Sequence, residues 1–215
     1  MNSILRVDIA PILAPFASRL PTRHIVLETQ LLARSAETLQ RALPAGCWLF
    51  VVDEITWGVA GEAVDQSVRA AGGTTLRYTV EAAPGEAVPV ADDAKVDVLE
   101  ARLRKGDVTA VVAVGSGTVN DIAKLATFRA GLPYAVVATS PSMNGYTSAI
   151  AAILSQGVKV TLPCHAPIAC LADLDVMAQS PYRMIASGFG DLLSKPVSNA
   201  DWRLGARLVG SDYSP

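Results

Sequence analysis

Short apolar runs alternate with amphipathic segments along most of the chain. Runs that predict strands occupy residues 48–52, 75–80, 108–114 and 134–138. Apolar residues at helical spacing predict helices at residues 24–43, 57–71, 92–104 and 118–130. Strands that alternate with helices form a mostly parallel sheet covered on both faces. We therefore expect a doubly wound α/β domain.

The pattern changes after residue 148. Residues 158–162 and 168–171 are predicted to form two short strands, as a hairpin or an irregular connection. Beyond residue 175 the spacing is helical, and Pro181 suits the first position of a helix. We expect residues 1–160 to form a dinucleotide-binding α/β domain and residues 161–215 to begin an all-helical domain.

A glycine-containing turn, GSGTVNDIAK at residues 115–124, joins a predicted strand to a predicted helix. A helix start leaves backbone N–H groups unpaired and carries about half a positive charge, so it suits a pyrophosphate. Gly115 and Gly117 allow close approach of the backbone. The alternative is an ordinary turn in which Thr118 and Asp121 form a capping box.

Polar segments follow three of the predicted strands, at Asp53, at residues 115–121 and at residues 139–144. In doubly wound sheets ligands bind at the carboxyl ends of the strands, where these segments should meet. This convergence favours phosphate binding over a simple capped turn.

Composition narrows the function classes. With 18 basic and 20 acidic residues the chain has a formal charge of −2, which gives no electrostatic signal for nucleic acid or an anionic membrane. No uninterrupted apolar run reaches the ~20 residues that span a bilayer, and no signal peptide is evident. Three cysteines do not suggest a disulfide scaffold, so we expect a cytoplasmic protein.

The chain resembles the glycerol-1-phosphate dehydrogenase family, within the iron-containing alcohol dehydrogenase and dehydroquinate synthase-like superfamily. The resemblance rests on GSGTVNDIAK at 115–124, TSPSMNGYTS at 139–148, ADLDVM at 172–177, and ASGFGDLLSK at 186–195 followed by DW. It implies an enzyme that reduces dihydroxyacetone phosphate with NADH or NADPH in a cleft between a dinucleotide-binding domain and a helical domain. It also implies a homo-oligomer and a divalent metal, which could be Zn, Ni or Fe.

The resemblance also implies which residues bind the cofactor. Around the pyrophosphate these would be Gly115, Gly117, Thr118, Val119, Asn120 and Asp121, and toward the nicotinamide Thr139, Ser140, Pro141, Ser142 and Ser148. Asp53 is placed to accept hydrogen bonds from the adenosine ribose, and its charge would repel a 2′-phosphate and so favour NAD. The alternative for Asp53 is a helix N-cap or loop carboxylate.

Two further residues are implied in substrate binding and chemistry. Asn144 matches a position where many relatives carry an Asp that contacts substrate, although Asn144-Gly145 is also a favourable turn dipeptide. Asp191 matches the relatives' metal ligand, where the metal would polarise the substrate carbonyl and stabilise the alkoxide. The alternative for Asp191 is a helical ion pair with Lys195.

The family's two metal-binding histidines have no match in this sequence. Its only histidines are His24 and His165, and we interpret His165 as structural. One helical stretch also cannot cover its own apolar residues Met184, Ile185, Leu192, Leu193, Trp202, Leu204 and Leu208. We therefore expect a sequence truncated relative to the family that is not a competent dehydrogenase by itself.

The sequence leaves two alternative functions open. A polyol dehydrogenase of the same superfamily would replace the phosphorylated triose by glycerol. A shortened, non-catalytic nucleotide-binding protein, acting as a sensor, a pseudoenzyme or half of an assembly, would bind NADH without turnover.

Overall fold

A computed structural model describes residues 4–213 of the chain, and six parallel strands form its central sheet. From one edge to the other these are β1 (His24–Glu28), β8 (Ala169–Asp173), β5 (Tyr134–Ala138), β4 (Ala110–Gly115), β2 (Cys47–Val52) and β3 (Thr74–Thr79). Every neighbouring pair is parallel, which confirms the expected doubly wound α/β fold.

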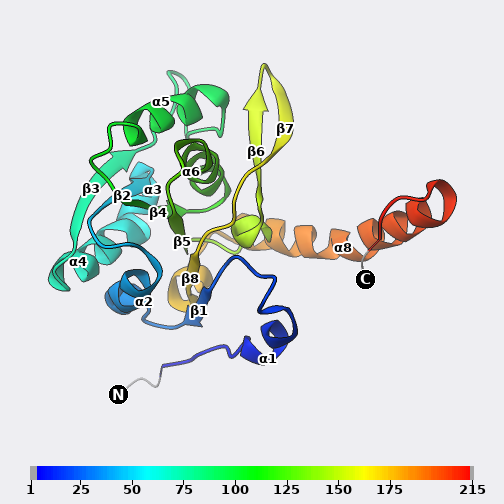
Figure 1. Cartoon of the computed structure of the whole chain (residues 1–215), viewed down its shortest axis with the longest axis horizontal. Coiled ribbons are helices and arrows are strands. Elements are labelled where there is room, and N and C mark those ends of the chain that lie inside the picture. The colour runs from blue at the N-terminus through cyan, green and yellow to red at the C-terminus, as the bar shows by residue number, and fades with distance from the viewer. Residues whose placement is uncertain (1–3, 214–215) are drawn as a thin grey trace.

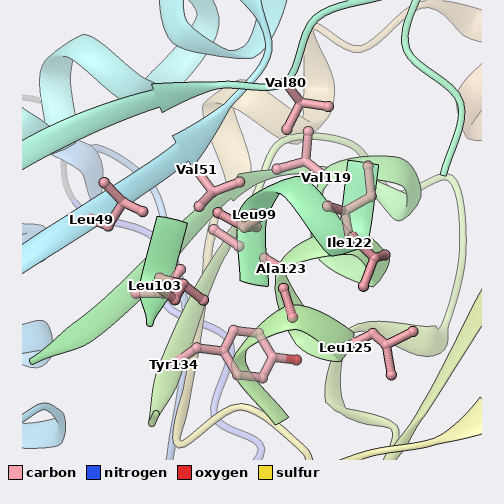
Figure 2. Packing of buried hydrophobic residues seen from close by; sticks show 14 of the residues in the cluster. Leu49, Val51, Val80, Leu99, Leu103, Val119, Ile122, Ala123, Leu125 and Tyr134 are labelled. Carbon is pink, nitrogen blue, oxygen red and sulfur yellow. The ribbon is translucent and has the colours of Figure 1, made fainter. Parts of the chain in front are cut away.

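Helices cover both faces of this sheet (Figure 1). One face packs against α2 (Ser35–Ala42) and α4 (Glu62–Ala70), and α4 follows α3 (Glu54–Thr56) and a π-helical turn at Trp57–Gly61. The opposite face packs against α5 (Asp93–Leu103) and α6 (Gly117–Ala130). Figure 2 shows Leu99 and Leu103 of α5 gathered with Val119 and Ile122 of α6 in this second cluster. Alternate residues of each inner strand fill the two cores.

The remaining elements lie outside the sheet. They are α1 (Ala10–Leu13), the hairpin strands β6 (Ile150–Ser155) and β7 (Val158–Pro163), α7 (Leu174–Ala178) and α8 (Tyr182–Val209), with 3-10 turns at Ala14–Phe16, Leu32–Arg34 and Gly145–Thr147. Helix α8 extends away from the sheet in Figure 1 and has no buried residue. Among the described helices, none combines the length and hydropathy that a membrane crossing requires.

The helix expected over residues 24–43 is wrong in its first half. Residues His24–Glu28 instead form β1, which pairs with β8 at the sheet edge, and the helix is confined to Ser35–Ala42. The β-branched Ile25 and Val26 favour a strand, and long-range pairing with β8 outweighs the helical spacing of the apolar residues.

The hairpin suggested for residues 158–162 and 168–171 has a different pairing. Strand β7 pairs with β6, while the second segment becomes β8 and inserts between β1 and β5. Gln156 and Gly157 both have positive φ, at 49° and 79°, which is the backbone of a two-residue hairpin turn. The chain therefore returns to the sheet after residue 160, before α7 and α8 begin.

Candidate functional site

A pocket of about 670 Å³ lies where β4 ends and α6 begins. The turn into α6 forms one side, and the hairpin β6–β7 forms another. The segment that follows β5, two residues of α8, Ser187 and Asp191, and the residues Val90 and Ala91 before α5 complete the lining. The pocket thus lies at the carboxyl edge of the sheet, as the polar segments of the sequence predict.

The start of α6 lacks a side-chain cap. Its first residue is Gly117, and the Ser116 side chain makes no capping hydrogen bond. The first amide with a helical acceptor is that of Asn120, which donates to the Ser116 carbonyl at 3.0 Å. The N–H groups of Gly117, Thr118 and Val119 have no such acceptor within the helix. The alternative capping box is therefore wrong, because the Asp121 carboxylate instead accepts from the Ala152 amide at 3.3 Å.

The two glycines of this turn differ in their surroundings. A Cβ at Gly115 would lie 2.6 Å from the Val119 Cβ, so this glycine allows α6 to pack tightly on β4. A Cβ at Gly117 would meet only the Met143 Sδ, at 3.9 Å, and would project into open space at the pocket. Gly117 thus leaves room for a ligand beside free N–H groups, which fits a dinucleotide pyrophosphate.

The pocket gathers about half of the expected site residues. Those that line it are Gly117, Thr118, Asp121, Ser142, Asn144, Ser148 and Asp191. The others, which lie outside this lining, are Asp53, Gly115, Val119, Asn120, Thr139, Ser140 and Pro141. Among the latter, the buried Asn120 side chain and the Ser140 hydroxyl have no hydrogen-bond partner in the described residues. Unpaired buried polar groups are rare and mark places where a ligand group or water is expected.

Asp53 follows β2 and forms the N-cap of α3. Its Oδ1 accepts from the Thr56 amide at 2.7 Å, and the Thr56 hydroxyl accepts from the Asp53 amide at 2.9 Å. The alternative raised from the sequence, a capping carboxylate, is therefore present. The cap engages Oδ1, and Oδ2 is not part of it.

Asp191 lies on α8 and faces the pocket. Its Oδ2 accepts from the Asn144 backbone amide at 2.9 Å, and Lys195 donates to its Oδ1 at 3.0 Å. These two hydrogen bonds, that of Lys195 first, hold the pKa of Asp191 below its usual range. The Lys195 ion pair considered from the sequence is thus present, and it coexists with a contact between α8 and the loop at Asn144.

The described residues do not complete a metal site. Asp121 and Asp191 are the carboxylates in the pocket lining, and no group of three potential ligands occurs among residues 4–213. His165 instead stacks on Tyr134 and lies 3.0 Å from the Thr127 hydroxyl, which matches its structural interpretation. Asp191 can supply one oxygen ligand, but a catalytic metal takes about three protein ligands.

Lys124 is a residue that the sequence reasoning passed over. It is fully buried on α6, and its ammonium donates to three acceptors beside the pocket. The available signal was its position, because it lies among apolar residues that face the core, such as Ile122 and Leu125. A lysine there is unusual, since lysine is almost never fully buried without partners.

A family model and individual relatives both relate this chain to the same family of proteins. The model of the iron-containing alcohol dehydrogenase family matches residues 26–181. The chain is 36% identical over 185 residues to a glycerol-1-phosphate dehydrogenase (NAD(P)+) of Bacillus velezensis, covering 85% of this chain and 46% of the relative. It is 30% identical over 192 residues to that of Pyrococcus abyssi, covering 89% and 53%. The chain thus spans about half the length of these curated relatives.

Solved structures show the same fold. Glycerol dehydrogenase from Schizosaccharomyces pombe superposes with a TM-score of 0.70 at 24% identity, over 82% of this chain and 43% of that one. NADH-dependent butanol dehydrogenase A from Thermotoga maritima also gives 0.70, at 22% identity, over 82% and 48%. At these identities the superpositions support the fold alone.

Proposed function

The chain belongs to the iron-containing alcohol dehydrogenase family, and from that premise we propose that it forms the nucleotide-binding part of an NAD(P)-dependent, metal-dependent dehydrogenase. The proposed reaction reduces dihydroxyacetone phosphate to glycerol-1-phosphate. The names of the relatives from Bacillus velezensis and Pyrococcus abyssi support this substrate. The observation that carries the proposal is the uncapped start of α6, open to the pocket at Gly117.

In this proposal the pyrophosphate accepts hydrogen bonds from the first N–H groups of α6. When bound, NAD(P)H supplies the hydride. Ser142 and Ser148 orient the cofactor from the pocket wall. The unpaired Asn120 amide and Ser140 hydroxyl, which lie outside the pocket lining, form hydrogen bonds to the cofactor or to a water that it binds. Oδ2 of Asp53 accepts from the adenosine ribose, and its negative charge favours NAD over NADP.

At the other side of the pocket, Asn144 and Asp191 contact the substrate. The Asn144 amide side chain can both donate to and accept from a substrate hydroxyl. Asp191, kept ionised by Lys195 and the Asn144 amide, provides one carboxylate ligand for a divalent metal. Further ligands would come from polypeptide outside residues 4–213, in a helical domain of which α8 is the beginning. A cytoplasmic location and a homo-oligomer remain predictions of the sequence.

The test measures NADH oxidation by the protein expressed from its whole gene, with an added divalent metal. Dihydroxyacetone phosphate should be reduced with a kcat/KM at least about tenfold above that of dihydroxyacetone, because the phosphate contributes binding energy away from the reacting carbon. Asp191→Ala should lower metal-dependent turnover by about 100-fold or more while NADH affinity stays nearly unchanged.

Asp201→Ala is the matched control, since Asp201 is an exposed carboxylate on the same helix. Full turnover by Asp191→Ala would contradict the metal role. Equal use of both substrates would indicate a polyol dehydrogenase instead. NADH binding without any turnover would indicate the non-catalytic nucleotide-binding protein.

A further inference from the structure

The buried Lys124 contacts the segment that leads from strand β5 to strand β6. Its ammonium donates to the Gly145 carbonyl, the Ser148 hydroxyl and the Ile150 carbonyl, each at 3.0 Å. These acceptors lie on a short stretch of chain that turns from the loop after β5 into β6. One side chain of α6 thus holds three points along six consecutive residues.

The same stretch forms a wall of the pocket. Gly145, Ser148, Ile150 and Ala152 all line it, opposite the uncapped start of α6. Asp121, one helical turn before Lys124, accepts a hydrogen bond from the Ala152 amide and adds one more contact between α6 and this stretch. We call residues 145–152 the anchored wall.

Burying an ammonium costs free energy of solvation, so the need to fill space in the core does not by itself explain a lysine at this position. Burial lowers the pKa of Lys124, because the charged form is poorly solvated there, and nearby Asp121 opposes this shift at 3.9 Å. Replacing a whole buried ion pair by apolar residues of similar volume is often neutral or stabilising, whereas removing one partner alone leaves the other charge uncompensated. A methionine would fill the same space without the desolvation penalty, but it could not donate to the anchored wall.

We propose that Lys124 is a positioning residue that fixes the anchored wall against α6, so that the wall and the helix start together form the dinucleotide site. The identity of the ligand rests on the proposed function. The anchoring itself rests on the three hydrogen bonds and on the full burial of Lys124. Lys124 touches no reacting atom in this account and acts through residues 145–152.

The experiment compares the unaltered protein with Lys124→Met and with Lys105→Met, which removes the same charge from an exposed position after α5. Three quantities are measured: the urea midpoint of unfolding, the NADH dissociation constant by fluorescence, and hydrogen–deuterium exchange of peptides that cover residues 145–152. For Lys124→Met we expect exchange at least about tenfold faster in the anchored wall and NADH affinity at least about tenfold weaker. Its urea midpoint should fall, because three acceptors and Asp121 lose their buried partner. The exchange of β4 and β5 should nevertheless stay close to that of Lys105→Met.

Unchanged exchange in residues 145–152 would overturn the proposal. A uniform increase across the sheet would also overturn it, because Lys124 would then stabilise the fold as a whole and not the anchored wall in particular. If Lys124→Met does not fold, Ser148→Ala decides the question, because it removes one acceptor and leaves the lysine. Faster exchange confined to the anchored wall then supports the proposal, and unchanged exchange contradicts it. If even the unaltered protein does not bind NADH, the proposed function fails while the exchange result still tests the anchor.

Discussion

His165 shows how a single side chain can be taken for a metal ligand or for a core residue. Its ring stacks on Tyr134 with centroids 5.4 Å apart and meets the edge of Phe128 at 5.7 Å. Nε2 lies 3.0 Å from the Thr127 hydroxyl. Burial, with a smaller effect from the Lys124 charge, lowers the pKa of His165. The imidazole is therefore a half-buried packing element beside α6, and its surroundings favour its neutral form.

This lowered pKa predicts a pH dependence of stability. The unfolded chain binds a proton at His165 more readily than the folded chain, so folding stability is fully present above the ordinary histidine pKa of 6.5 and falls as the pH drops below it. The slope from one such group is at most about 1.4 kcal/mol per pH unit.

Urea unfolding at a series of pH values between 5 and 8 measures this pH dependence of the free energy of unfolding. His165→Phe keeps an aromatic ring and should remove this part of the slope, with His24→Phe as the control for loss of an imidazole. An unaltered slope in His165→Phe would show that other groups cause the pH dependence.

At the scale of elements, α8 meets the rest of the molecule where two of its residues reach the loop after β5. Asp191 accepts from the Asn144 amide, and Gly188 lies directly against Pro141. A Cβ at Gly188 would overlap the Pro141 carbonyl oxygen and lie 2.8 Å from its carbon, both of them backbone atoms. The absence of a side chain at Gly188 is what lets Asp191 reach the pocket.

Gly188→Ala should therefore displace α8 from the loop. Overpacking of this kind typically costs about 1–3 kcal/mol, and here the helix can relieve the clash by moving away. We expect the Asn144 amide to lose its acceptor and to exchange with solvent faster, measured by NMR. Gly190→Ala is the matched control, because an added Cβ there meets nothing within 4 Å. Equal exchange in the two variants would mean that Gly188 does not set the position of Asp191.

The elements that the sequence predicted well are those whose pattern of apolar residues and flanking turns can be recognised within the segment itself. Strands β2, β4 and β5 are continuous apolar runs bounded by turns, and α5 and α6 occupy nearly the expected ranges. Strand β1 was missed because its partner, β8, lies 145 residues later in the chain, and apolar spacing along the chain carries no information about that pairing. The hairpin was mispaired because no strand was predicted at Ile150–Ser155, which left the segment at residues 168–171 as the only available partner of β7.

For the candidate site, the sequence indicated which segments line the pocket, but it did not indicate which atoms their residues contact. Gly117, Asn144 and Asp191 are far apart in the chain and line one pocket, as the motifs in their segments suggested. The separate functions of Gly115 and Gly117, and the three hydrogen bonds of Lys124, depend on neighbours that the sequence does not specify. Both depend on tertiary packing around α6.

At the scale of the whole molecule, the sheet and its covering helices are well packed, whereas α8 is not. Leu192, Leu193 and Leu208 are exposed on this helix, and no residue of α8 is buried. In Figure 1 it extends beyond the body of the molecule. An apolar helix in this arrangement is typical of an interface, and it agrees with the proposal that α8 begins a helical domain.

The central claim is that a dinucleotide binds at the start of α6, and NADH titration of Gly117→Val tests it most directly. The valine side chain would enter the space beside the first N–H groups, while Gly58→Val places the same side chain at another helical glycine with nothing within 4 Å. We expect the NADH dissociation constant to rise at least about tenfold, or about 1.4 kcal/mol, in Gly117→Val alone, with both variants folded. Equal NADH affinity in Gly117→Val and the unaltered protein would contradict it.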